Sequence, residues 1–322
     1  MGAGIVPIVI GTDAGGSARI PPTFNGVYGL MPSHNRTVRH KFTMCATGPV
    51  AATATDLTIA YRIMAQPDPG CTTSSLFATS TPPAPGAKRY IGVYRDWWAG
   101  ADPRVQDVCE KAVNHMASKY GYEVVDITIP FIPESRTAHS LICVSEMCEM
   151  ARRRTPNPAD WLSLVGPANK LLMSVGTQTP TADFLKSNSL REVLMQHLAF
   201  LFQKYPNLLI VTPTAPAIGW PRTPGDEAYG ASNTNMAFKN MMYVFLANMT
   251  GTPSLSVPAG YVDPEQGEGR LAVGMMATAE WGAEELLLAW ARESEEYLHE
   301  EITGGRRRPK TWFDVLEEAK KE

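Results

Sequence analysis

The sequence predicts an α/β fold in which a mixed, twisted sheet is covered by helices on both faces. Short runs of β-branched and apolar residues at 4–10 and 208–214 are typical of buried strands. Segments 102–120 and 284–302 instead carry apolar residues at helical spacing. A chain of 322 residues, 44% of them hydrophobic, is long enough to bury a substantial core. We therefore expect a single domain over residues 1–322.

The first predicted strand, Gly4–Ile10, is apolar on both faces, ends at Gly11 and leads into the loop Thr12-Asp13-Ala14-Gly15-Gly16-Ser17. Two adjacent glycines let the backbone turn tightly, so that successive N–H groups face one point. Such a loop can form an oxyanion hole while a serine hydroxyl attacks a carbonyl carbon. A flexible turn is the simpler interpretation of the glycines alone. The predicted nucleophile is Ser17, and the predicted oxyanion donors are the backbone N–H groups of Ala14, Gly15, Gly16 and Ser17.

The longer string around this loop is more specific. GTDAGGSARIPPTFNGVYG at 11–29, continuing to LMPS at 30–33, closely resembles the core motif of the amidase signature family. Members of that family are serine hydrolases that cleave amides and sometimes esters. The resemblance implies that Ser17 is the nucleophile and that Asp13 and Arg19 form a charged pair bracing the loop. NMTGTPSLSVP at 248–258 resembles a second block of the family.

The family also uses a lysine and a second serine, which lie upstream of the strand that leads into the GTD motif. No Ser-Ser-Gly-Gly element precedes that strand here, and no lysine occurs before Lys41. The resemblance thus implies an amidase-signature-like core that lacks its N-terminal portion. His34 and His40 are candidate replacement bases, although an interpretation as ordinary loop residues is favoured.

Two functions remain open at this stage. The first is a hydrolase of a small amide or ester, with a missing N-terminal segment or a second chain supplying the base. The second is an amidase-derived scaffold without hydrolytic activity, which acts as a ligand-binding protein or as a non-covalent cyclase or isomerase. In either case the expected partner is a small molecule.

The elements that follow the loop can be read in order. A helix is predicted from Asp56, with Ile59, Ala60, Ile63 and Met64 on one face, and residues 68–87 are rich in Pro, Ser, Thr and Gly, which favours a surface loop. A β-α-β unit is predicted next. It comprises a strand at Tyr90–Tyr94, a helix at Asp102–Tyr120 and a strand at Glu123–Ile129.

Residues 131–204 are predicted to be mostly helical. Within them, Ser140–Met150 is rich in Met and Cys, which favours core packing over the alternative of ligand contact. Arg152-Arg153-Arg154 is read as a solvated turn near a helix C-terminus, with contact to an anionic substrate as the alternative. The remaining elements are predicted from their apolar patterns. They are strands at Leu208–Thr214 and Leu271–Met276 and a helix at Glu284–Ile302.

Composition excludes several classes of function. Lys+Arg 29 against Asp+Glu 32 gives a net charge of −3, which does not favour binding to nucleic acid or to an anionic membrane. No apolar run is long enough to span a bilayer and no signal peptide is recognised, so a cytoplasmic protein is expected. The five cysteines form no CxxC pair and the histidines no HExxH motif. Neither a metal nor a cofactor is expected.

Overall fold

The computed structural model describes residues 1–72, 74, 81–221, 223–229, 233–265, 267–302 and 304–321. Part of the predicted loop 68–87, namely 73 and 75–80, lies outside these residues. The strands are β1 (Ile8–Asp13), β2 (Tyr28–Met31), β3 (Ala46–Ala51), β4 (Tyr90–Val93), β5 (Glu123–Asp126), β6 (Leu208–Pro213), β7 (Ser254–Val262) and β8 (Leu271–Thr278). The helices are α1 (Ile20–Asn25), α2 (Ala54–Met64), α4 (Arg95–Trp98), α5 (Pro103–Tyr120), α6 (Ile132–Arg152), the 3-10 helix η1 (Pro158–Leu164), α7 (Pro167–Gly176), α8 (Thr181–Lys204), α9 (Asp226–Tyr229), α10 (Thr234–Asn240), α11 (Phe245–Thr250), α12 (Glu284–Glu301) and α13 (Val315–Ala319).

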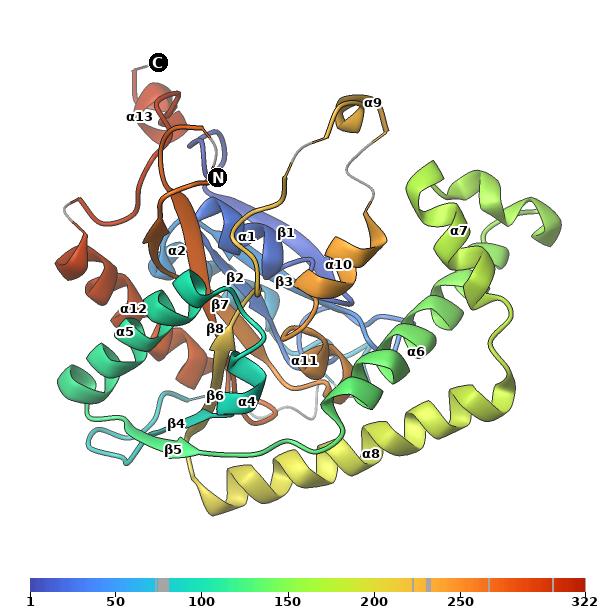
Figure 1. The fold of residues 1–322 in the computed structure, drawn as a ribbon, viewed down its shortest axis with the longest axis horizontal. Coiled ribbons are helices and arrows are strands. Elements are labelled where there is room, and N and C mark those ends of the chain that lie inside the picture. The colour runs from blue at the N-terminus through green and yellow to red at the C-terminus, as the bar shows by residue number, and fades with distance from the viewer. Residues whose placement is uncertain are drawn as a thin grey trace.

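The strands form one eight-stranded sheet in the order β1-β3-β2-β7-β8-β6-β4-β5. β4 pairs in parallel with β5 and β6, whereas the other neighbours are antiparallel, so the sheet is mixed. Helices pack on both faces, and α6, α7 and α8 form a helical group at one side of it (Figure 1). The predicted fold class is therefore confirmed. Within the described residues, no helix is both long and apolar enough to cross a membrane.

The central elements match their sequence patterns. α5 begins after Asp102, whose side chain accepts a hydrogen bond from the Arg104 N–H and caps the helix. Its apolar residues Val105, Cys109, Ala112, Val113 and Met116 are buried, and Val108 is partly buried against the same core. α12 buries its apolar stripe against β7, α2 and α5. Residues 131–204 are mostly helical, as predicted.

The first strand differs from the prediction. It starts at Ile8 rather than Gly4 and extends through Gly11 to Asp13. It lies at the edge of the sheet, where β3 is its one partner among the described strands. Val9 is 42% exposed and Ile10 is 62% exposed, so the strand is not buried on both faces. Apolar β-branched residues favour a strand without specifying whether it has one neighbour or two. β1 consequently presents an exposed apolar edge.

The buried face of α2 also differs from the prediction. The helix begins at Ala54, because the Thr53 hydroxyl caps it by accepting the Asp56 N–H at 3.0 Å. Leu57 and Tyr61 face the core, whereas Ile59 and Ile63 are 51% and 70% exposed. This helix is apolar around much of its circumference, so periodicity alone did not identify the face that packs on the sheet.

Candidate active site

The loop between β1 and α1 has a shape that its glycines make possible. Gly16 has φ of +104°, and a Cβ added to it would lie 2.6 Å from Val244 Cγ2. The Gly16 carbonyl accepts the N–H groups of Arg19 and Ile20, at 2.9 and 2.7 Å, and so begins α1. A larger residue at this position would have to displace the neighbouring side chain. The turn therefore brings Ser17 to the start of the helix.

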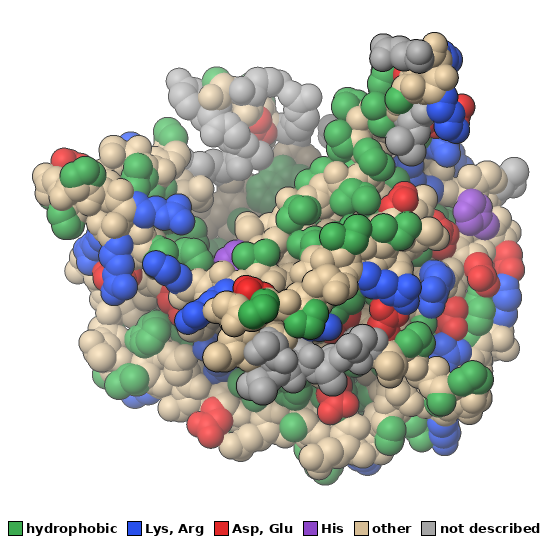
Figure 2. Space-filling view, turned by 180° about the vertical axis from the view of Figure 1, so that it is seen from behind, with side chains coloured by type: hydrophobic (Ala, Val, Ile, Leu, Met, Phe, Trp, Pro, Cys, Tyr) green, Lys and Arg blue, Asp and Glu red, His purple; other side chains and the backbone are tan. Residues whose placement is uncertain are grey.

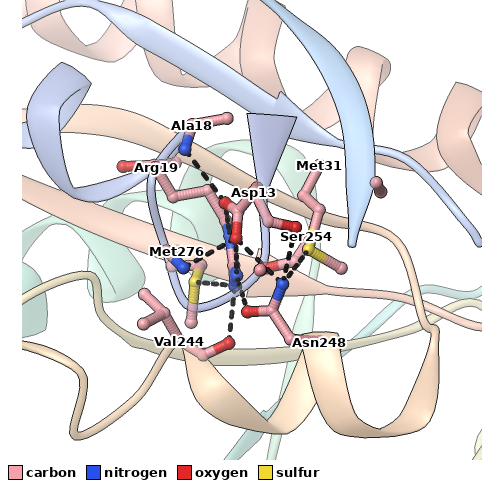
Figure 3. Close-up of polar contacts among 12 residues, drawn as sticks. Asp13, Ala18, Arg19, Met31, Val244, Asn248, Ser254 and Met276 are labelled. Carbon is pink, nitrogen blue, oxygen red and sulfur yellow. Dashed lines mark hydrogen bonds and ion pairs between the residues drawn. The ribbon is translucent and has the colours of Figure 1, made fainter. Parts of the chain in front are cut away.

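A buried ion pair between Asp13 and Arg19 joins the two ends of the loop (Figure 3). Arg19 donates from Nε to Asp13 Oδ2 at 2.9 Å and from Nη2 to Oδ1 at 3.0 Å, and both side chains are 0% exposed. The same carboxylate accepts the backbone N–H groups of Gly16 at 2.6 Å and Ala18 at 3.1 Å. Burial alone would raise the pKa of Asp13, but the charge of Arg19 and the hydrogen bonds that the carboxylate accepts hold it below its usual value. The predicted contact between Asp13 and Arg19 is present.

Asn248 completes this network, and the sequence analysis did not single it out. Arg19 Nη2 donates to Asn248 Oδ1 at 2.6 Å, and Asn248 Nδ2 donates to the Asp13 carbonyl at 3.0 Å (Figure 3). Asn248 is fully buried on α11. The only signal for it was its place at the start of the second block that resembles the family. The network thus links the loop to a helix far along the chain.

Ser17 is exposed and lines a cavity of about 520 Å³. The walls come from loop residues 12–17, segment 42–45 and helices α6, α7 and α10. Among the described residues, the backbone N–H groups of Ala14, Gly15 and Ser17 have no hydrogen-bond acceptor, whereas the Gly16 N–H donates to Asp13. The prediction that Gly16 contributes to an oxyanion hole is therefore revised, because the buried carboxylate engages its N–H.

His139 is a further residue of this cavity that the sequence analysis missed. It lies on α6, is 0% exposed, and its Nε2 is 2.8 Å from the Ala14 carbonyl oxygen. Burial lowers the pKa of His139 to about 4, so the ring is neutral near pH 7. The hydrogen bond assigns the proton to Nε2, which donates to Ala14. In a trans peptide the C=O and the following N–H point in opposite directions, so this bond also fixes the direction of the Gly15 N–H.

We expect His139→Leu to loosen the Ala14–Gly15 peptide, because the carbonyl loses its donor. The free energy of unfolding should fall by about 1 kcal/mol from the lost hydrogen bond, and the Gly15 amide should exchange faster with solvent. Urea unfolding and amide hydrogen exchange measure the two effects. His139→Gln, which keeps a side-chain N–H donor, is the matched control. Equal Gly15 exchange rates in both variants would contradict the positioning role.

One other sequence interpretation changes at this site. Core packing was favoured for Ser140–Met150, but Cys143, Glu146 and Met147 line the cavity, as Ser140 and Val144 also do. Core packing was the wrong interpretation for these residues, because one face of α6 lines the cavity while another packs on α8. The patterns of Met and Cys did not distinguish these faces.

The histidines considered as replacement bases lie elsewhere. Neither His34 nor His40 lines the cavity that contains Ser17. His34 is half-buried next to Gly251, and desolvation lowers its pKa to about 4. His40 Nε2 lies 2.5 Å from Thr47 Oγ1. The favoured interpretation of both as residues of the loop therefore stands.

Comparison with known proteins identifies the family of this chain. The family model named Amidase matches residues 1–288. The chain therefore belongs to the amidase family, and its mixed sheet with covering helices is the fold of amidase signature enzymes.

Two curated relatives show how much of the family's length is present. Fatty acid amide hydrolase of Medicago truncatula is 31% identical, with 98% of this chain and 52% of that protein aligned. A glutamyl-tRNA(Gln) amidotransferase subunit of Thermus thermophilus is 29% identical, with 92% of this chain and 65% of that protein aligned. This chain spans about half to two thirds of the length of these relatives.

Solved structures support the same fold at lower identity. A bacterial aryl acylamidase of the amidase signature family has a TM-score of 0.70 at 20% identity, covering 92% of this chain and 63% of its own. The 6-aminohexanoate cyclic dimer hydrolase complexed with substrate has a TM-score of 0.72 at 19% identity, covering 95% of this chain and 67% of its own.

Proposed function

We propose that this chain carries the nucleophile and oxyanion hole of an amide hydrolase that acts on a small amide or ester. The supporting observation is the exposed Ser17 hydroxyl, which lies in a cavity beside backbone N–H groups that lack an acceptor in the described structure. Ser17 Oγ attacks the carbonyl carbon, and the N–H groups of Ala14, Gly15 and Ser17 stabilise the negative oxygen that forms. The amine then leaves with a proton, and water hydrolyses the acyl-serine.

Such a reaction needs a base, and the described groups in the cavity are poorly suited to that task. His139 has a pKa of about 4 and already donates to Ala14. Burial raises the pKa of Cys45 to about 11 and that of Cys143 to about 12, so both are neutral thiols near pH 7. Glu146 accepts two hydrogen bonds from Thr43. A general base works best with a pKa near the operating pH, which none of these histidine and cysteine side chains has.

We further propose that the base comes from a segment or a second chain outside residues 1–322. The exposed apolar edge of β1, next to the reactive loop, is a suitable docking surface for a strand. Similar proteins support an assembly. The Thermus thermophilus relative is a subunit of an amidotransferase, and one solved structure of similar fold is a vestigial protein complex related to an s-triazine catabolic enzyme. The cytoplasmic location expected from the sequence stays a prediction.

Labelling with a fluorophosphonate tests the nucleophile. The chain alone should react slowly, because no base removes the hydroxyl proton, and mass spectrometry should find the adduct on Ser17. Ser17→Ala should abolish the adduct. Thr12→Val, which removes another hydroxyl at the same cavity, should leave it unchanged.

An adduct on any other residue would contradict the assignment of Ser17. Complete absence of an adduct, even when the base-bearing segment is supplied, would instead favour the non-hydrolytic scaffold, which binds a ligand without covalent chemistry.

A further inference from the structure

A second cavity, of about 330 Å³, lies at the C-terminal end of α6. Segment 39–42 forms one wall and the end of α6 forms the other. Figure 2 shows Lys and Arg side chains gathered on the side of the molecule where α6 and α7 lie. The cavity is lined by Arg39, His40, Lys41, Phe42, Met150, Arg153 and Arg154. We call it the basic cavity.

The positive charges of the basic cavity are largely uncompensated. Arg153 pairs with Glu149 at 2.8 Å. In the described part of the chain, Arg39, Lys41 and Arg154 have no carboxylate within ion-pair distance, and no carboxylate lines the cavity. Cations at the end of α6 interact favourably with the helix dipole, but Arg39 and Lys41 come from a different segment. Like charges gathered around a hollow repel one another, and a bound anion relieves that repulsion.

The basic cavity adjoins the cavity of Ser17. Phe42 lines both. The next residue fixes this segment to α6, because Glu146 accepts the Thr43 N–H at 2.9 Å and the Thr43 hydroxyl at 2.6 Å. The basic cavity and the cavity of Ser17 are therefore neighbours along α6, and Phe42 lies at their boundary.

We propose that the basic cavity binds a carboxylate or phosphate group at the far end of the substrate whose amide lies at Ser17. Guanidinium groups suit this ligand, because they donate paired hydrogen bonds that match the geometry of carboxylate and phosphate oxygens. The position of the amide rests on the proposed function, whereas the anion site does not. A cavity of about 330 Å³ is within the size range of small-molecule sites, which favours a small molecule over a nucleic acid.

Binding of linear amides to the Ser17→Ala protein tests the proposal without requiring turnover. Succinamic, adipamic and sebacamic acids each carry a terminal carboxylate, and butyramide, hexanamide and decanamide are their uncharged counterparts of equal chain length. For the length that spans both cavities, we expect the charged amide to bind at least about tenfold more tightly at low ionic strength. Isothermal titration calorimetry measures each dissociation constant.

Variants then locate the anion. Arg39→Gln together with Arg154→Gln should remove the difference between charged and uncharged amides and leave the uncharged amide unaffected. Arg152→Gln is the matched control: it removes the same charge from the same helix end, but Arg152 does not line the basic cavity. Equal affinities in all pairs of amides, or an equal loss in the control, would overturn the proposal.

Inorganic phosphate distinguishes the source of the anion. Competition of phosphate with the charged amides, but not with the uncharged ones, would support one substrate that spans both cavities. Phosphate that binds in the basic cavity without competing would overturn the assignment to the substrate. Because no step here depends on catalysis, a preference for the charged amide would survive even if fluorophosphonate never labelled Ser17.

Discussion

Arg19→Leu is expected to lower the free energy of unfolding by about 3–5 kcal/mol, because it leaves the Asp13 carboxylate buried without its counter-charge. Urea unfolding followed by circular dichroism measures this. Lys111→Leu is the control, since Lys111 and Asp107 form an ion pair with side chains 69% and 63% exposed. An exposed pair contributes about 0–1 kcal/mol. A loss for Arg19→Leu as small as that of the control would contradict the bracing role.

The same ion pair has a pH dependence whose sign can be worked out. The pKa of Asp13 is lowered from 3.8 in the folded protein, so its contribution to stability is present above the unfolded-state pKa. It is lost as pH falls through the folded-state pKa. In Arg19→Leu the balance reverses, because burial then raises the pKa of Asp13 without an opposing charge. The variant should therefore begin to gain stability, relative to wild type, as the pH is lowered toward acid.

A double variant separates charge from packing. Asp13→Asn with Arg19→Leu should cost less than the sum of the two single variants, since neither charge is then left unpaired in the interior. Additive losses would indicate that the two side chains act independently.

The second large effect concerns turnover. Residues 1–322 alone are expected to hydrolyse small amides no faster than Ser17→Ala does. Supplying the lysine and second serine on an adjoining segment or chain should raise kcat by up to about a millionfold, the scale of loss when a catalytic base is removed from another serine hydrolase. Release of a chromophoric amine from an anilide measures both states.

Ser17→Ala is the control, and it should abolish the amide hydrolysis that the added segment or chain restores. Fast hydrolysis by the chain alone, abolished by Ser17→Ala, would mean that a group within residues 1–322 removes the proton. The groups of the cavity, beginning with Glu146, would then be the candidates to replace one at a time.

The shape of the loop between β1 and α1 was predictable because its constraints are local. A strand, two glycines and a nearby charged pair specify the turn within a few residues, and Asp13 and Arg19 lie in one continuous motif. His139 and Asn248 were missed because they contact the loop from α6 and α11. Contacts between residues so far apart in the chain leave no pattern in the local sequence. The misjudged faces of β1 and α2 have a related cause. Apolar residues favour burial of the surface that carries them. Which face of a strand or helix becomes buried depends on how the neighbouring elements are arranged.

The contact between Asp13 and Asn248 joins residues 235 positions apart. During translation, Asp13 leaves the ribosome long before Asn248 has been synthesised, by roughly 10–50 s at usual elongation rates. Throughout that interval Asp13 and Arg19 lack the amide that joins them to α11. A nascent or prematurely terminated chain thus contains Ser17 without the support that orders its loop. The network that supports the Ser17 loop is therefore completed only late in synthesis.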